Sequence, residues 1–208
     1  MTVLSADIIT KSLYSAYDLA AINTPLIGSV AELAEDYLKA NKYNKEKSID
    51  SLIRWQCSKA GMSGLILGIP GGFLAAGTIP ADIFNTFVIQ MRLASSIAYI
   101  NEYDLHSDQV KIMCIATACG AKTADVLKGV GVKVGEAYAK KMISSISGET
   151  IKQINKAVGT RLLTKFGEKG VINLGKLLPI VGGVIGGSVD TIATYATGKA
   201  AKGLFKSE

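Results

Sequence analysis

Histidine, cysteine and aromatic residues are scarce in this sequence. The one histidine is His106, and the cysteines, Cys57, Cys114 and Cys119, are odd in number and have no paired spacing. A disulfide framework and zinc sites with several histidines are therefore excluded, and a serine-type triad would have to use His106. Aromatic residues make up only 7% of the chain, so its hydrophobic content of 49% is mainly aliphatic. That composition favours closely packed helices.

Signals for export are also lacking near the start of the sequence. Asp7 and Lys11 interrupt the stretch in which a signal peptide needs an unbroken apolar core, and no basic segment precedes it. Together with the unpaired cysteines, this pattern favours a reducing, cytoplasmic setting, with peripheral attachment to the inner membrane as a further expectation.

An uncharged run lies between Lys59 and Asp82 and contains 22 residues, 60 to 81. A helix of about 20 apolar residues is long enough to cross a bilayer. Six glycines and Pro70 interrupt this run, however, and leave two arms that are each too short to span. We expect a buried glycine-mediated helix hairpin here, with shallow membrane insertion as the alternative.

Helical periodicity dominates the rest of the chain. Apolar residues recur at spacings of three and four, and strand-like alternation is scarce. The pattern predicts an all-α fold of about eight helices in a single domain, residues 1–208. Capping signals mark several helix starts, namely Ser29 with Glu32, Asn44 or Ser48, and Ser107. Pro80 fits the first turn of a helix that ends near Asn101.

Glycines spaced by four occur in two apolar segments, and a proline, Pro70 or Pro179, stands just before the Gly-Gly pair of each. Such spacing places small residues on one helix face, where another backbone can approach closely. We predict two glycine-rich hairpins at the centre of the fold. The candidate helix-contact residues are Gly64, Gly68, Gly72, Gly182, Gly183, Gly186 and Gly187.

Positive charge is concentrated in the second half of the chain. Residues 1–60 have net charge 0 and residues 61–110 have −3, whereas residues 111–208 hold 15 Lys/Arg against 6 Asp/Glu, a net charge of +9. Such a region suits an anionic membrane surface, although solubilising lysines on helix faces give the same pattern. Pairs spaced by four share a helix face. The candidate lipid-facing set is Lys140, Lys141, Lys152, Lys156, Lys165 and Lys169.

A polar stripe follows Pro80 on the predicted helix. At 100° per residue, Asp82, Asn85, Arg92 and Ser96 fall within about 80° of one another. The stripe is either the solvent-exposed face of an amphipathic helix or the lining of an internal polar pocket. If it is buried, Arg92 needs a carboxylate partner, for which Asp82 and Asp190 are the candidates.

Motifs for metals and nucleotides are weak or absent. His106 lies among acidic residues, but Ser107 and Asp108 fit a helix start, so a turn is favoured over a cation site. The glycine-rich stretches match neither the phosphate-binding loop nor the dinucleotide fingerprint. We expect no cofactor, no metal and no nucleotide, and nucleic acid is a poor candidate for a partner.

Three runs carry a family resemblance: RWQCSKAGMSGLILGIPGG, TIPADIFNTFVIQMRLASSIAYINEYDL and LLPIVGGVIGGSVDTIATYATGKAAKGLF. Over about residues 45–205 they resemble the bacterial EcsC protein family, in which a glycine-rich turn precedes a proline-aspartate helix start and a Q-x-R-x-x-x-x-I-A core. The matching positions are Pro80, Asp82, Gln90, Arg92, Ile97 and Ala98. The resemblance implies a helical bacterial protein and supplies no catalytic residue. On it, residues 1–44 would be N-terminal helices packed on the EcsC-like region.

Three functions remain open from the sequence. The first is a nonenzymatic EcsC-type protein at the inner face of the membrane, which engages anionic lipid or a membrane protein. The second is a soluble helical module with an apolar or amphiphilic ligand in an internal pocket near Asp82, Arg92 and Asp190. The third is a hydrolase-type enzyme that uses Asp82 or the surroundings of His106.

Overall fold

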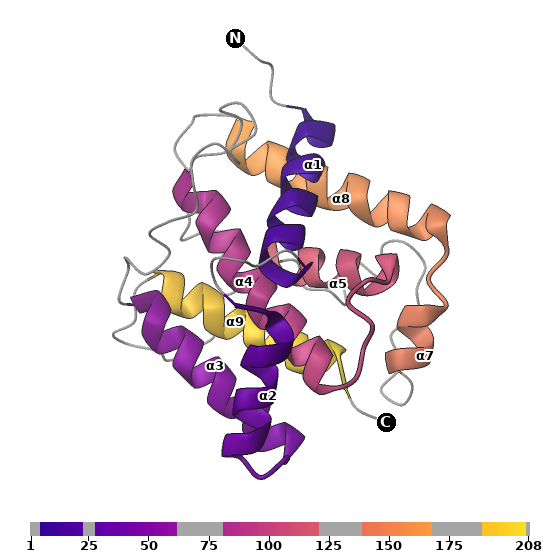
Figure 1. Cartoon of the computed structure of the whole chain (residues 1–208). Helices are drawn as coiled ribbons and strands as arrows, with labels where there is room; N and C mark the ends of the chain where they lie inside the picture. Colours follow the sequence, from indigo (N-terminus) through magenta and orange to yellow (C-terminus); the bar gives the residue numbers. More distant parts are fainter. Residues whose placement is uncertain (1–4, 23–27, 62–80, 121–138, 168–188, 207–208) are drawn as a thin grey trace.

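The computed structural model describes residues 5–22, 28–61, 81–120, 139–167 and 189–206, and all regular structure in them is helical. The all-α prediction is therefore confirmed. The predicted glycine-rich hairpins, with all seven of their listed glycines, lie outside these residues. The described α-helices are α1 (Ala6–Tyr17), α2 (Val30–Ala40), α3 (Lys45–Gly61), α4 (Ala81–Ile100), α5 (Asp108–Ala118), α7 (Ala139–Ser144), α8 (Gly148–Gly167) and α9 (Val189–Leu204), and a π-helical turn, η1 (Asp18–Ile22), follows α1 (Figure 1).

Side-chain caps fix several of the helix starts. At α2, Ser29 Oγ accepts from Glu32 N at 3.0 Å and Glu32 Oε2 accepts from Ser29 N at 2.9 Å, so the predicted capping box is confirmed. Ser107 caps α5 through Val110 N, also as predicted. At α3 the cap is Asn44, whose Oδ1 accepts from Lys47 N at 2.9 Å. Local sequence thus determines where these helices begin.

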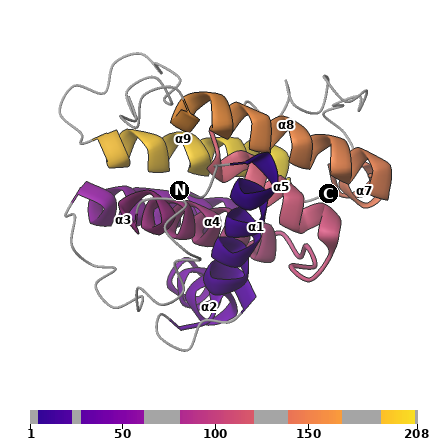
Figure 2. The same cartoon turned by 90° about the horizontal axis from the view of Figure 1, so that it is seen from above.

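The core is built around α4 and α5. α4 packs against α1, η1, α2, α3, α5 and α9, which surround it in both views (Figures 1 and 2). α5 is buried on nearly all sides, since every residue from 112 to 118 is buried. A helix that is apolar all round belongs in the interior of a bundle. The helices of the first and second halves of the chain therefore share one hydrophobic cluster.

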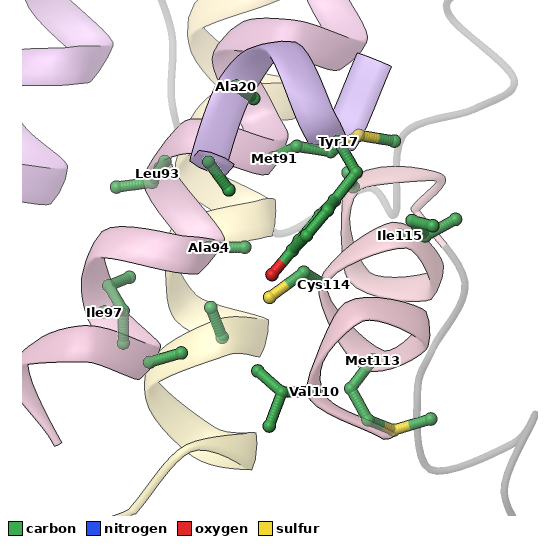
Figure 3. Packing of buried hydrophobic residues seen from close by; sticks show 14 of the residues in the cluster. Tyr17, Ala20, Met91, Leu93, Ala94, Ile97, Val110, Met113, Cys114 and Ile115 are labelled. Carbon is green, nitrogen blue, oxygen red and sulfur yellow. The ribbon is translucent and has the colours of Figure 1, made fainter. Parts of the chain in front are cut away.

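Tyr17 is the largest fully buried side chain of this cluster. Its ring lies between α4 and α5 with its oxygen turned toward Cys114 (Figure 3). The hydroxyl donates a hydrogen bond of 2.8 Å to the Leu105 carbonyl, so the buried polar atom is satisfied. Burial raises the pKa of Tyr17, and it raises the pKa of the Cys114 thiol to about 12. Both groups are therefore neutral at physiological pH and serve packing.

Two glycines that the spacing argument does not single out lie where helices approach closely. A Cβ at Gly198 in α9 would lie 2.7 Å from Ile53 Cγ1 in α3, and a Cβ at Gly159 in α8 would lie 3.0 Å from the Ala6 carbonyl oxygen in α1. Distances below about 3 Å are too short for nonbonded carbon atoms. The α3–α9 contact therefore depends on the absence of a side chain at Gly198, whereas at Gly159 an added Cβ would be tight against α1.

The end of α9 is anchored beside the turn between α4 and α5. Phe205 is fully buried, and its ring packs edge-on against Tyr103 with centroids 5.1 Å apart. Asn101 Nδ2 donates to the Phe205 carbonyl, and the Tyr103 hydroxyl donates to the Lys206 carbonyl at 3.0 Å. These contacts join the end of α9 to residues that are about 100 positions earlier in the sequence.

Candidate functional site

The structure describes the side chains of only part of the polar stripe on α4. Ser96 is fully buried, and its Oγ donates to the Arg92 carbonyl one turn earlier at 2.8 Å. Asp82 and Asn85 belong to α4 and Asp190 to α9, but their side chains lie outside the described residues. The described part of the stripe therefore consists of Arg92 and Ser96, and the pairing of Arg92 with Asp82 or Asp190 stays a prediction.

Arg92 is half-buried and holds backbone from two other elements. Its Nη1 donates to the Gly28 carbonyl at 2.8 Å and to the Ala20 carbonyl at 3.4 Å, and Nη2 donates to the Ser29 carbonyl at 3.4 Å. Burial lowers the pKa of the guanidinium, which the nearby Glu32 carboxylate partly offsets. The planar fork therefore ties η1 to the start of α2. This role is structural, and the sequence did not indicate it.

We expect Arg92→Lys to lower the free energy of unfolding by about 1–3 kcal/mol. A single ammonium group cannot reproduce the geometry with which the guanidinium reaches three carbonyls, so some of these acceptors lose a charged donor. Thermal unfolding followed by circular dichroism measures the loss. Arg54→Lys is the control, because Arg54 is exposed on α3 and the one described hydrogen bond of its guanidinium goes to Ser51 Oγ. Equal melting temperatures for the two variants would contradict the role of Arg92.

The clearest charged surface lies on α8 and α7 at the periphery of the fold. α8 buries Ile154, Val158 and Leu162 against α1 and α5. Its opposite side is exposed and carries Lys152 and Lys156, which are one turn apart. Amphipathic spacing thus forces these two lysines outward while the aliphatic stripe is buried.

Few acidic groups balance the lysines of this surface. Glu149 Oε2 lies 3.8 Å from Lys152 Nζ, but both side chains are more than two-thirds exposed, and such a pair contributes little. On α7, Lys141 is exposed, and Lys140 Nζ lies 5.7 Å from the centroid of the Tyr103 ring. Residues 139–167 contain six Lys/Arg and one acidic residue. We call Lys140, Lys141, Lys152 and Lys156 the α7–α8 lysine surface.

Two of the predicted lysines, Lys165 and Lys169, are not among these four. α8 is one continuous helix, and position 165 is nine residues after Lys156, which is two and a half turns at 100° per residue. Position 165 therefore lies on the opposite side of the helix axis from Lys156. Lys169 lies outside the described residues, so its place beside the other lysines stays a prediction.

The neighbourhood of His106 is a helix-to-helix turn. His106 is exposed, and its backbone N–H donates to Asp104 Oδ1 at 2.9 Å immediately before the Ser107 cap. Within the described ranges, no group of three or more histidine, cysteine, aspartate or glutamate residues is arranged to hold a metal ion. The described geometry therefore assigns a turn-forming role to this acidic cluster.

In the parts of the chain that the structure describes, no helix combines the length and the apolar character needed to cross a bilayer. The uncharged run at 60–81 lies almost entirely outside these parts. Comparisons with protein-family models, with curated proteins and with solved structures give no match to this chain. The relation to the EcsC family therefore stays a prediction from the sequence.

Proposed function

We propose that this chain is a nonenzymatic protein of EcsC type that attaches to the inner face of the bacterial membrane by binding anionic lipid through the α7–α8 lysine surface. The observation that carries the proposal is the outward placement of Lys152 and Lys156 on α8, with exposed Lys141 on α7. The net charge of +9 in residues 111–208 supplies a favourable field around them.

The expected attachment is weak and reversible. A lysine that reaches an anionic membrane contributes about 1 kcal/mol, so four lysines correspond to a Kd of about 1 mM from this contact alone. Exposed charges are screened within about 10 Å at moderate ionic strength. Binding should therefore weaken as salt is raised, which is typical of a peripheral protein.

The first test neutralises the two outward lysines of α8. We expect Lys152→Gln with Lys156→Gln to weaken binding to vesicles of phosphatidylglycerol and phosphatidylcholine about thirtyfold, because about 2 kcal/mol of attraction is lost. Sedimentation with vesicles over a range of salt concentrations measures the effect. Both side chains are exposed, so the helical circular dichroism spectrum should not change.

Matched variants distinguish the effect of these lysines from the effect of net charge alone. Arg54→Gln with Lys199→Gln removes the same two charges from exposed positions on α3 and α9. This control should bind nearly as well as the unmodified chain. Equal losses for the two pairs would show that only total charge matters, and equal sedimentation with pure phosphatidylcholine would refute electrostatic attachment. Absence of binding to both kinds of vesicle would favour the soluble, pocket-containing alternative.

A further inference from the structure

The turn between α2 and α3 presents the most exposed large hydrophobic side chain of the described residues. Tyr43 is 61% exposed, compared with 41% for Trp55 and 36% for Tyr195. α2 ends at Ala40 and α3 begins at Lys45, so Tyr43 stands on a four-residue connection. The ring therefore contributes little to the core, and its position needs another explanation.

The backbone of this turn adopts a conformation that usually belongs to glycine. Lys42 has φ 54° and Tyr43 has φ 59°, both in the left-handed region. Tyr43 N donates to the Leu38 carbonyl at 2.7 Å and Lys42 N donates to the Lys39 carbonyl at 3.1 Å, so the tight turn closes the end of α2. Residues with a Cβ are strained there. The sequence nevertheless places a lysine and a tyrosine at these positions, which points to a use for their side chains.

Positive charge surrounds the exposed ring. Residues 39–47 contain four lysines and one acidic residue, Glu46. Lys39, Lys42 and Lys47 are exposed, whereas Lys45 Nζ forms an ion pair of 2.7 Å with Glu102. Glu46 Oε1 in turn lies 3.8 Å from Lys202 Nζ. We call Lys39, Lys42, Tyr43 and Lys47 the Tyr43 tip.

A tyrosine among lysines has the chemistry that an anionic lipid surface selects. The phenol has an apolar ring and a polar end, and such side chains are enriched where hydrocarbon meets water. Lysine stems cover apolar surface while their ammonium groups reach lipid phosphates. The tip is too small for a stable protein interface, which usually buries about 800 Å² on each partner. A lipid surface is the occupant that fits its size and charge.

The tip lies away from the outer side of α8, which carries Lys152 and Lys156. α8 lies at one end of the fold and the turn between α2 and α3 at the other, and the two views agree on their separation (Figures 1 and 2). α8 packs on α1 and α5, whereas α2 packs on α3 and α4. One flat surface therefore cannot contact the tip and the outer side of α8 together.

From this placement we propose that the Tyr43 tip is a second lipid-binding element, and that one molecule bridges two anionic membrane surfaces. The proposal rests on lipid binding by the α7–α8 lysine surface and adds the second contact. It predicts that the full chain clusters vesicles of phosphatidylglycerol and phosphatidylcholine in equal amounts, and that it does not cluster vesicles of phosphatidylcholine.

The decisive variants change the tip alone. Tyr43→Gly should slow vesicle clustering, measured by dynamic light scattering, about tenfold or more, because the interfacial side chain is lost. Thermal stability should stay equal or rise, since glycine accepts the left-handed backbone. Lys42→Gln with Lys47→Gln should weaken the tip contact about fivefold for each lysine. Sedimentation of all these variants should change far less than clustering, because α8 still binds.

Controls distinguish this inference from the proposed attachment. Tyr195→Ala removes an exposed aromatic ring from α9 and should leave clustering unchanged. Lys152→Gln with Lys156→Gln should weaken both clustering and sedimentation. Sedimentation without clustering would refute bridging and leave the proposed attachment intact, whereas no sedimentation at all would refute both. Light scattering without lipid measures whether the chain is a dimer. If the chain is a dimer and the tip variants still cluster vesicles, the inference is also overturned.

Discussion

Phe205→Ala is expected to lower the free energy of unfolding by about 3–5 kcal/mol, the usual result of truncating a buried phenylalanine. Phe205 is fully buried against Tyr103, and the side chains of Asn101 and Tyr103 hold the carbonyls of Phe205 and Lys206. Loss of the ring leaves a cavity and releases the end of α9 from the turn after α4. Because α9 also packs on α3, the effect should spread through the bundle.

Thermal unfolding provides the measurement for Phe205. In a chain of this length, each kcal/mol shifts the melting temperature by about 2–4 °C, so a decrease of about 10 °C is expected. Lys206→Ala is the matched control, since Lys206 is exposed and contributes a backbone carbonyl that alanine also provides. Comparable decreases in the two variants would show that burial of the Phe205 ring does not account for the loss. A Tyr103→Ala variant should resemble Phe205→Ala, because it removes the other ring of the pair.

Features that depend on a few neighbouring residues were predictable from the sequence. The caps at Ser29 and Ser107 each involve a side chain and an amide three residues later. Such contacts form whenever the helix forms, whatever packs around it. The predicted end of α4 near Asn101 is also correct, since Ile100 is its last residue. Fold class and helix starts therefore follow from local pattern.

Contacts between distant segments were not predictable in the same way. The position of Arg92 on α4 was evident, but its described acceptors are carbonyls 63 to 72 residues away in the sequence. Every residue has a backbone carbonyl, so residue identity does not indicate such an acceptor, whereas a carboxylate partner can be read from the sequence. Tyr43 was missed because its exposure depends on two left-handed residues that are not glycine.

The helical angle between Lys156 and position 165 follows from counting residues along α8, and it is half a turn beyond two full turns. Spacing by four shows that two residues share a face, but it does not show that two such pairs share the same face. Glycine spacing has a similar weakness, because Gly159 and Gly198 have no glycine partner four residues away and still lie at close contacts.

Gly198→Ala is expected to lower the free energy of unfolding by about 1–3 kcal/mol, and Gly198→Leu by more. An added Cβ would lie 2.7 Å from Ile53 Cγ1 and 3.1 Å from its Cγ2 and Cδ1. Ile53 is buried and branched at Cβ, so it has little freedom to turn away. α9 cannot readily move outward, since Lys202 pairs with Asp50 at 2.7 Å and Thr191 Oγ1 donates to the Cys57 carbonyl at 3.3 Å.

Gly203 provides a control on the same helix. A Cβ there meets nothing within 4 Å, so Gly203→Ala should stabilise the chain by about 0.5–1 kcal/mol through helix propensity. The two alanine variants should therefore shift the melting temperature in opposite directions.

Ile53→Ala tests the contact itself, because it removes the three atoms that the new methyl group would meet. In a double-mutant cycle, the combined variant should lose less stability than the sum of the single variants, since the added methyl occupies space that Ile53 vacated. Strictly additive losses, or equal shifts for Gly198→Ala and Gly203→Ala, would show that α3 and α9 do not meet at this glycine.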